Sequence, residues 1–334
     1  MGDVAMTIPV LYSFAARYPE HEIRVLSRRS FAPLFGHHPP NLKFVGVDLE
    51  DYRGIGGLER LFRILYAGNF DAVADLHDVL RTKFLRFRFR LKGVKAVSID
   101  KGRREKRRLT RRKNKMCRPL KTSFQRYAEV LHKLGYPFDM NFRSVFDGAE
   151  GDSEVVRAFA GEKGNDKWVG IAPFAKHKGK TYPPALMQEV IEGLSACGIR
   201  IFLFGGGRSE IAFFEAQKKR LPELRIVAGA MNMGGELELM NRLDCMLSMD
   251  SANMHMASLT GTPVISIWGA THPYAGFMGW NQKEAVQLEM DCRPCSVFGN
   301  KPCLRGDYAC MYGIRPNEIV DRIKTLLYET NFQD

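Results

Sequence analysis

The stretch at residues 247–255, Leu-Ser-Met-Asp-Ser-Ala-Asn-Met-His, decides how the C-terminal half of this chain folds. An apolar run ends abruptly in Asp250, a short amphipathic segment follows, and a second apolar run ends in Gly-Ala-Thr at 269–271. This order predicts strand, loop, helix and strand. In an open parallel sheet, ligands collect at the carboxyl ends of the strands, where loops and helix N-termini offer backbone N–H groups. We therefore expect residues 250–255 and 269–271 to lie side by side at that edge.

The rest of the chain also alternates strands with helices, mostly on the N-terminal side of this stretch. In the first half we expect strands at 23–26, 42–47, 70–76 and 94–99, with helices at 30–35, 58–67 and 122–134. In the second half we expect strands at 168–172, 199–204 and 224–228, with helices at 183–196, 209–221, 236–243 and 316–328. Such alternation is typical of βαβ units and parallel sheets, so the fold class is α/β.

The length favours two domains, because 334 residues exceed what one hydrophobic core usually serves. We assign residues 1–150 to an N-terminal Rossmann-like domain and 151–334 to a second one, with a linker at 137–151 and a cleft between the two sheets. The chain opens on Gly2 and Asp3, a turn that normally follows a strand, and no strand precedes it. We therefore expect the first domain to lack its first strand and the natural chain to begin upstream.

Composition excludes several classes of protein. Hydrophobic residues make up 45% of the chain and the mean hydropathy is −0.24, as in ordinary globular proteins. There is no apolar run of about 18 residues and no signal-peptide pattern, so the default compartment is the cytoplasm. Seven cysteines, an odd number in a long chain, are not typical of a secreted disulfide scaffold.

Basic residues are concentrated in one segment. Residues 81–126 hold 20 Lys and Arg against 2 acidic residues, a local charge of +18 in a chain of net charge +13. We expect this basic segment, which belongs to the first predicted domain, to face a polyanion, either a phosphorylated lipid surface or a nucleic acid. Its run at 101–115 is too charged to pack in a core. Phe84, Phe87 and Phe89 alternate with arginines, which leaves RNA binding as an alternative, although an amphipathic element explains the same pattern.

Three further loops hold candidate site residues. Lys176 and Lys180 lie between a strand and a helix, where cations and helix N–H groups suit a diphosphate. Three glycines at 205–207 precede Glu210, but their spacing is not that of a dinucleotide dehydrogenase, and Glu210 suits a ribose diol. No Asp-x-Asp occurs, which disfavours a transferase that holds its diphosphate through a divalent metal. For Asp250 the structural alternative is a helix N-cap, and for His255 it is packing against the sheet.

Five motifs occur in an order and at intervals that resemble a known family. They are Gly2-Asp3-x-x-x-Thr7-x-Pro9, Lys180-x-x-Pro183, the turn at 205–210, Asp250-Ser251-x-x-x-His255 and Gly269-x-Thr271-x-Pro273. Together they span nearly the whole chain and resemble the ADP-heptose:lipopolysaccharide heptosyltransferases, glycosyltransferase family nine. The sequence departs from the family at Ala252, where glycine is usual.

The resemblance implies a GT-B fold and an inverting, metal-independent transfer of heptose from ADP-L-glycero-D-manno-heptose to the lipopolysaccharide inner core, without a cofactor. It makes Asp3 the general base, places Lys180 on the diphosphate together with Lys176, and places Glu210 on the ribose. It also implies that Asp250 contacts the donor heptose. The remaining residues of the donor pocket would be Ser251, Asn253, His255, Gly269 and Thr271.

The same resemblance makes the basic segment an acceptor site. The phosphorylated lipopolysaccharide core would contact the cationic side chains of Arg103, Arg104, Arg107 and Arg108. The protein would then lie peripherally on the anionic inner face of the inner membrane and bind no nucleic acid. Alternatives are a transferase for another nucleotide sugar, a nucleotide-sugar 2-epimerase of GT-B fold, and the RNA-binding protein considered above.

Four cysteines near the C-terminus suggest one further alternative. The spacing of Cys292 and Cys295, followed by Cys303 and Cys310, is similar to a zinc knuckle, in which four thiolates share one tetrahedral ion. The spacing after the first pair is irregular, and the prolines and glycine between the cysteines are typical of a surface loop. We therefore expect no metal in the reaction and keep structural zinc as an alternative.

Overall fold

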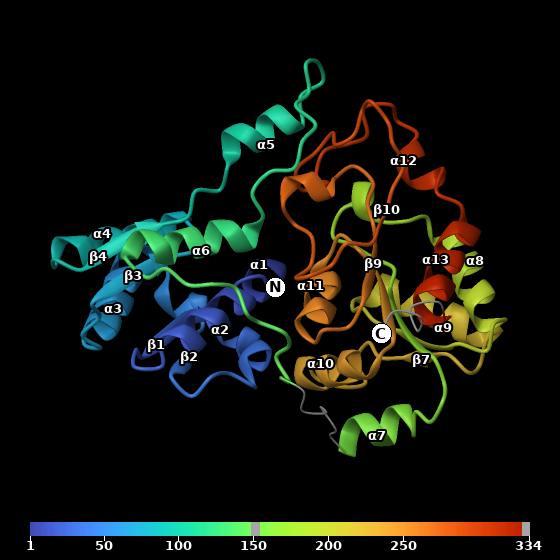
Figure 1. The fold of residues 1–334 in the computed structure, drawn as a ribbon, viewed down its shortest axis with the longest axis horizontal. Helices are drawn as coiled ribbons and strands as arrows, with labels where there is room; N and C mark the ends of the chain where they lie inside the picture. The colour runs from blue at the N-terminus through green and yellow to red at the C-terminus, as the bar shows by residue number, and fades with distance from the viewer. Residues whose placement is uncertain (148–153, 329–334) are drawn as a thin grey trace. The chain divides into compact units, whose positions relative to one another are not determined.

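The computed structural model of the chain describes residues 1–147 and 154–328, so residues 148–151 of the predicted linker lie outside the described part. The chain divides into two compact units (Figure 1). The first comprises Met1, Asp3–Arg103 and Lys121–Phe142, and the second comprises Gly2, Arg104–Leu120 and the chain from Arg143 on. The basic segment 81–126 is therefore divided between the units.

The second unit is built on one parallel sheet of six strands. Its strands are β5 (Trp168–Ala172), β6 (Arg200–Leu203), β7 (Arg225–Ile226), β8 (Cys245–Met249), β9 (Val264–Ile267) and β10 (Ala285–Val286). Their spatial order is β10-β9-β8-β5-β6-β7, and every neighbouring pair is parallel. The chain thus winds outward from β5 in one direction and from β8 in the other, which puts the switch in strand order between these two central strands.

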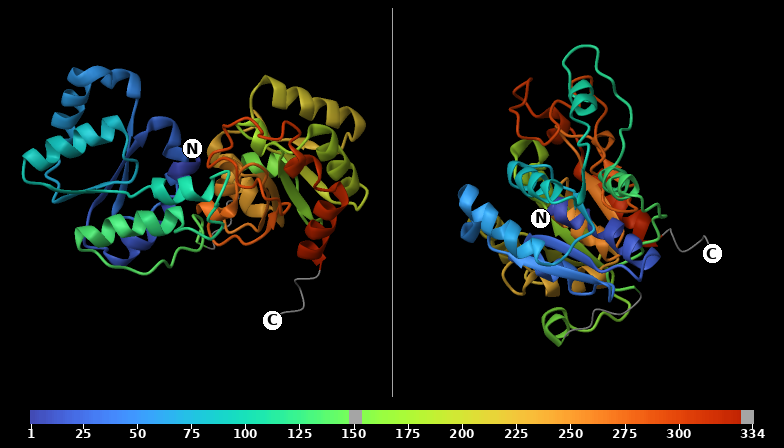
Figure 2. Two further views of the ribbon diagram at one scale, coloured as in Figure 1. Left: turned by 90° about the horizontal axis from the view of Figure 1, so that it is seen from above. Right: turned by 90° about the vertical axis from the view of Figure 1, so that its left-hand side faces the viewer.

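Helices cover both faces of this sheet (Figure 2). The helices described after residue 153 are α7 (Glu154–Ala160), α8 (Pro184–Ser195), α9 (Arg208–Arg220), α10 (Met233–Arg242), α11 (Ala252–Leu259), α12 (Ala309–Tyr312) and α13 (Pro316–Tyr328), with short 3₁₀ turns η3 (Lys178–Lys180) and η4 (Pro273–Ala275). Of these, α7 packs on α10. All five residues of β5 and of β8 are buried, as expected for strands covered on both faces. Helices α8 and α13 pack together over the core that these strands form.

The first unit contains two separate pairs of parallel strands. The pairs are β1 (Ile23–Arg28) with β2 (Leu42–Val47), and β3 (Ala72–Asp75) with β4 (Lys95–Ser98). Its helices are α1 (Gly2–Ala5), α2 (Ile8–Arg17), α3 (Gly54–Tyr66), α4 (Leu80–Leu91) and α6 (Ser123–Leu134), with 3₁₀ turns η1 (Arg29–Phe35) and η2 (Leu49–Tyr52). Gly2 and Asp3, predicted as a turn, lie in helix α1, and β1 is the first strand in residues 1–147.

Local sequence signals explain where most elements begin and end. The strands predicted at 42–47 and 168–172 and the helix predicted at 316–328 have the predicted bounds. Thr122 and Gln125 form a capping box at the start of α6, and Gly135 ends this helix with φ 108°. The sequence pattern did not predict the two-residue strand β10 or the helices α7 and α12, which are too short to show periodicity. It also did not predict helix α4, where apolar and basic residues are intermixed. Among the described residues, no helix is long and apolar enough to cross a membrane.

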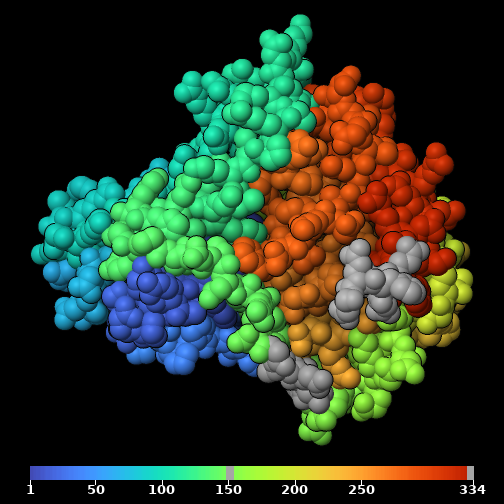
Figure 3. All heavy atoms as spheres, viewed as in Figure 1, coloured from blue at the N-terminus to red at the C-terminus, as the bar shows by residue number. Residues whose placement is uncertain are grey.

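The expectation that the run 101–115 stays out of any core is wrong. Residues Arg103–Leu109 form helix α5, in which Leu109 is fully buried and Lys106 is 9% exposed. The Lys106 ammonium lies 4.1 Å from the centre of the Phe277 ring, in the same unit. Packing is possible because an amphipathic helix turns single residues inward and a lysine stem is apolar. Most of the other residues of α5 and of the loop after it are exposed, and Figure 3 shows this segment standing out from the surface.

The aromatic residues of the basic segment lie on helix α4, mostly on its inner side. Phe89 is 3% exposed and Phe84 packs against the same small core, whereas Phe87 is 58% exposed. An RNA-binding surface of the stacking kind needs several exposed rings. The amphipathic explanation of the Phe-Arg alternation is therefore the correct one.

Candidate active site

Four connections leave the carboxyl ends of β5, β6, β8 and β9 in the second unit. The predicted donor-site residues lie in these connections or in the first turn of the helix that follows, α9 or α11. Lys176 and Lys180 follow β5, Glu210 follows β6, Asp250 follows β8, and Thr271 follows β9. Strands β5 and β8 are hydrogen-bonded neighbours at the switch in strand order. This is the place where open parallel sheets form ligand sites.

A buried ion pair joins the loops after β5 and β8. The Lys180 ammonium Nζ lies 2.9 Å from Oδ2 of Asp250, and the two side chains are only 16% and 6% exposed. Transfer of two charges out of water costs several kcal/mol per ion, so such a pair persists only with close geometry. Asp250 accepts this contact and does not cap a helix: the N-cap of α11 is Ser251, and no side-chain cap bond forms.

Close backbone contacts hold Lys180 in place. The backbone N–H of Lys180 donates to the carbonyl of His177, and the carbonyl of Gly179 accepts from Ala270 N at 2.8 Å. Gly299 has φ +72° and packs on the Lys180 stem so closely that a Cβ there would lie 2.4 Å from Cγ of the lysine. A loop distant in sequence thus packs against the Lys180 stem, a contact that sequence reasoning had no means to find.

Two buried polar side chains beside this pair have no hydrogen-bond partner in the described part of the chain. They are Nδ1 of His255 and Oγ1 of Thr271, in residues that are 6% and 0% exposed. Burial, with the nearby Lys180 cation, lowers the pKa of His255 to about 3, so its imidazole is neutral at physiological pH. Buried polar groups are nearly always satisfied, so these two atoms are suited to a bound ligand.

The other predicted donor-site residues lie in the same connections or at the start of helices α9 and α11. Oε2 of Glu210 accepts a 2.8 Å hydrogen bond from Gly206 N and so fixes the glycine turn. Oγ of Ser251 lies 3.2 Å from Oγ of Ser248. Lys176 is exposed, and Asn253 is half-buried at the start of α11.

The structure shows at which of two backbone positions a glycine is required. A Cβ on Gly269 would lie 2.8 Å from the carbonyl oxygen of Gly179, so the loop after β9 requires glycine for this close approach. Ala252 begins helix α11 and is not one of the residues with positive φ. The alanine at this position therefore fits the observed backbone without strain.

In the first unit, Asp3 lies in helix α1 and is exposed. The Tyr127 hydroxyl lies 3.4 Å from the backbone carbonyl of Asp3, and burial, together with the Asp3 carboxylate, raises the pKa of this tyrosine. The Asp3 charge also acts on His77, which follows strand β3. Sequence reasoning did not select His77, although a run of polar residues directly after a predicted strand was the available signal.

The predicted acceptor arginines lie on α5. Arg103 belongs to the first unit and its guanidinium lies 3.8 Å from Oδ2 of Asp78. Arg104 and Arg107 are exposed, Arg108 is half-buried, and in the described residues none of the three pairs with a carboxylate. Their charges are therefore available to an anionic partner.

The loop that contains the four C-terminal cysteines packs against the loop after β9. Cys295 N and Ser296 N both donate to the carbonyl of Ala270. The guanidinium of Arg293 donates to the carbonyls of Gly269 and Thr271. The four cysteines line one small pocket, and all are free thiols. Within residues 1–147 and 154–328, no three His, Cys, Asp or Glu side chains are placed to hold a metal ion.

Comparison with known proteins places the chain among glycosyltransferases. The family described as glycosyltransferase family 9 (heptosyltransferase) matches residues 58–303. Lipopolysaccharide heptosyltransferase 3 of Escherichia coli is 24% identical over 279 residues, which cover 81% of each chain. Among solved structures, a family 9 glycosyltransferase of Veillonella parvula superposes with a TM-score of 0.74 at 18% identity, covering 98% of this chain and 95% of the other. Heptosyltransferase WaaC of Escherichia coli with ADP gives a TM-score of 0.68 at 18% identity, with 98% and 97% covered. The likeness confirms the predicted GT-B fold.

Loss of Lys180 should strongly destabilise the second unit. The Lys180→Met variant leaves the Asp250 carboxylate buried without its counter-charge, at a cost of about 3 to 5 kcal/mol. All three tryptophans (168, 268 and 280) belong to this unit, so their fluorescence during urea unfolding of the ligand-free protein reports its stability. Adding Asp250→Asn should restore part of the loss. The control Arg305→Met removes an exposed pair with Asp307 and should leave unfolding unchanged. If Lys180→Met and Arg305→Met lowered the free energy of unfolding equally, the assigned role of the buried pair would be contradicted.

Cys310 should resist alkylation at neutral pH. Burial raises the pKa of its thiol to about 11, so at pH 8 about a thousandth of it is the reactive thiolate. Its rate of iodoacetamide labelling, followed by mass spectrometry, should rise about tenfold per pH unit until pH 11. Cys197 is exposed and serves as the fast-reacting control. Rapid labelling of Cys310 at pH 8 would contradict the assignment, and protection that a chelator relieves would reveal a bound metal instead.

Proposed function

Since the chain belongs to glycosyltransferase family 9, we propose that it transfers heptose from ADP-L-glycero-D-manno-heptose to the inner core of lipopolysaccharide, with inversion at the anomeric carbon. The observation that supports this most is the buried pair of Lys180 and Asp250 at the carboxyl ends of β5 and β8. A cation and a carboxylate held together in this way suit a ligand with a diphosphate at one end and sugar hydroxyls at the other.

The donor occupies the loops of the second unit. Lys180, with Lys176, binds the diphosphate, and the free oxygen of the Glu210 carboxylate accepts hydrogen bonds from the ribose hydroxyls. Asp250 accepts hydrogen bonds from the heptose hydroxyls. Oγ1 of Thr271 and Nδ1 of His255, which have no partner among the described residues, pair with polar groups of the same ligand.

The reaction is a single displacement. The Asp3 carboxylate removes the proton of an acceptor hydroxyl as its oxygen bonds to the anomeric carbon, and the bond from that carbon to the β-phosphate oxygen of ADP breaks. The proton stays on Asp3, and the electron pair of the broken bond leaves with ADP. The Lys180 ammonium stabilises the negative charge that develops on the leaving diphosphate. No Asp-x-Asp pair is present in the sequence, so we assign this charge stabilisation to lysine and not to a metal.

The family match favours this function over the alternatives. A nucleotide-sugar 2-epimerase of the same fold would need no acceptor arginines, and an RNA-binding protein would need exposed aromatic rings beside them. The acceptor is a phosphorylated core oligosaccharide on lipid, bound through Arg103, Arg104, Arg107 and Arg108. We therefore place the protein at the anionic inner surface of the inner membrane as a peripheral protein.

The Asp3→Asn variant should lose catalytic turnover but keep its affinity for the donor. An amide cannot accept the proton, so kcat for heptose transfer should fall by about 10²- to 10⁴-fold. ADP should raise the Tm of the variant as it does that of the wild type, and UDP or GDP should not. Asp71→Asn replaces another exposed carboxylate of the first unit and should keep full activity. Wild-type protein that transfers no heptose from ADP-heptose to a truncated lipopolysaccharide would overturn the proposed function.

Neutralising the four predicted acceptor arginines of α5 should weaken binding of the acceptor and leave binding of the donor unchanged. Replacement of Arg103, Arg104, Arg107 and Arg108 by Ala should raise the KM for acceptor and make it less dependent on salt, because the lost contacts are electrostatic. The Tm shift with ADP should remain. A control variant that removes Lys218, Lys219, Arg220 and Lys324 changes the net charge equally on α9 and α13. Similar kinetics for the two variants would show that only the total charge matters.

A further inference from the structure

Helix α4 of the first unit has an apolar stripe on its solvent-exposed side. Leu80, Phe84, Phe87 and Leu91 recur at the spacing of one helical face. Leu80, Phe87 and Leu91 are 85%, 58% and 60% exposed, whereas Phe84 is half-buried against the core of the first unit. Single exposed apolar residues are common on protein surfaces, but three aligned on one helix indicate a partner that covers them.

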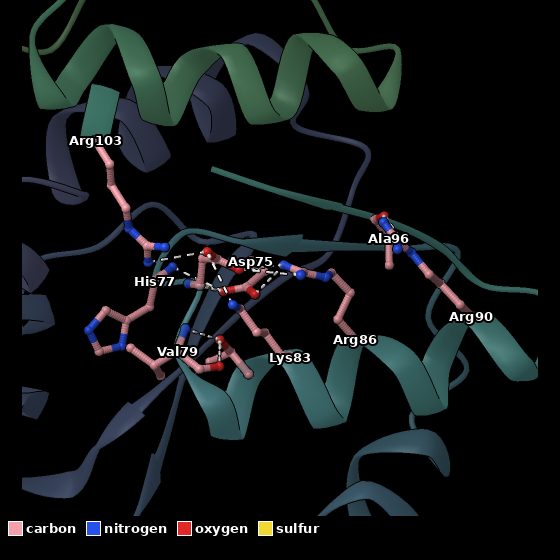
Figure 4. A network of polar contacts seen from close by, with 10 residues as sticks. Asp75, His77, Val79, Lys83, Arg86, Arg90, Ala96 and Arg103 are labelled. Atoms are coloured by element: carbon pink, nitrogen blue, oxygen red, sulfur yellow. Dashed lines mark hydrogen bonds and ion pairs between the residues drawn. The ribbon is translucent and has the colours of Figure 1, made fainter. Parts of the chain in front are cut away.

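Polar contacts on the inner side of α4 fix which face points outward. Nη1 of Arg86 lies 2.7 Å from Oδ2 of Asp75, and the two side chains are 14% and 3% exposed. Nε of Arg90 donates to the carbonyl of Ala96 at 3.1 Å. Figure 4 shows Arg86 and Arg90 reaching from α4 toward these groups at the end of β3 and in β4. Because Phe89 is buried on the same inner side, rotation of the helix would expose its ring, and the apolar stripe stays outside.

Basic side chains flank the apolar stripe on both sides. The helix contains five Lys and Arg and no Asp or Glu. Lys83 and Arg90 lie along one flank of the stripe at helical spacing, and both are exposed. Arg81 and Lys92 lie along the other flank, where both are exposed and neither has a carboxylate partner in the part of the chain that the structure describes. The surface is therefore apolar in the middle and cationic at its edges.

An anionic lipid bilayer fits this surface better than other partners. A helix with an apolar face and cationic flanks lies in the plane of the membrane interface, with its apolar side chains below the headgroups and its cations among them. RNA binds through stacked rings and cations, and it offers no apolar surface to Leu80 and Leu91. A second copy of this chain would bring like charges together, because α4 has no acidic residue to face them.

We propose that α4 is a membrane-binding element, and that Leu80, Phe87 and Leu91 insert into the interface of an anionic bilayer. This inference deepens the peripheral location, which rests on the proposed function, by naming the helix and the kind of contact. Insertion differs from the attraction assigned to the arginines of α5, since burial of apolar side chains does not depend on charge and salt weakens it little.

The test measures co-sedimentation of the full-length protein with vesicles of phosphatidylglycerol and phosphatidylcholine in equal parts. The triple variant Leu80→Gln, Phe87→Gln and Leu91→Gln should bind about 100-fold more weakly, because three apolar side chains lose their contact with the bilayer. Its urea unfolding should match that of the wild type, since the replaced side chains are exposed. The matched control should bind as the wild type, because its three exposed residues lie on separate helices of the second unit. It combines Val155→Gln, Ile211→Gln and Tyr328→Gln.

Two further measurements separate insertion from adsorption by charge alone. The Phe87→Trp variant places a fluorophore in the apolar stripe, and lipids brominated on their acyl chains should quench it more strongly than they quench the wild type. The double variant Arg81→Gln and Lys92→Gln loses two cations and should bind about 30-fold more weakly at low salt. Vesicles of phosphatidylcholine alone should bind the wild type and this double variant with similar, low affinity.

Equal vesicle affinity of the wild type and the triple variant would overturn the inference, as would fluorescence of Phe87→Trp that brominated lipid leaves unchanged. Sedimentation velocity without lipid tests the second copy: a dimer that the triple variant dissociates would assign the stripe to self-association and also overturn the inference. The vesicles contain no sugar donor and no acceptor, so these results are independent of heptose transfer. Protein that binds vesicles as expected but transfers no heptose would overturn the proposed function alone.

Discussion

The parallel pairing of β5 with β8 is the constraint on which the second unit depends. These strands are far apart in sequence, both are fully buried, and each ends in a loop with a charged residue. Once they pair in register, with Ala172 opposite Ser248, the chain that follows them has to enter the same small region. Lys180 and Asp250 meet there, and burial makes the contact between them obligatory, because either charge alone would be costly in a site so little exposed.

The loops around the Lys180–Asp250 pair are also held by close backbone contacts. Gly269 and Gly299 are sites where the backbone comes too close for a side chain, and both lie against the loop that contains Lys180. The cysteine loop is anchored on the carbonyls of residues 269–271 through Arg293 and Cys295. The cysteine loop is irregular and rich in proline, and it lies far along the sequence from the candidate catalytic residues. It is nevertheless part of the site, because it supports the end of strand β9, which Thr271 follows.

Charged side chains also gather at one place in the first unit, around the end of strand β3. Its segment after β3 contains two carboxylates and is followed by an unusually basic helix, yet the structure does not simply neutralise one with the other. Asp75 and Asp78 take Arg86, Lys83 and Arg103, while Arg81 and Lys101 have no carboxylate partner in the described residues. The end of the β3–β4 pair therefore keeps basic side chains beyond those that its two carboxylates neutralise.

The sequence by itself determined the alternation of strands and helices and the chain segments after β5, β6, β8 and β9 that contain Lys180, Glu210, Asp250 and Thr271. Periodicity and capping are local properties, and motif order along the chain is visible without a structure. It did not determine that α5 buries Lys106 and Leu109, that Phe84 and Phe89 point inward, or that the charges of Lys101 and Asp3 act on His77. Those facts depend on which strands pair and which helix face meets a core. Residues 77 and 101 become neighbours only because β3 and β4 are parallel and end together, which no local pattern records.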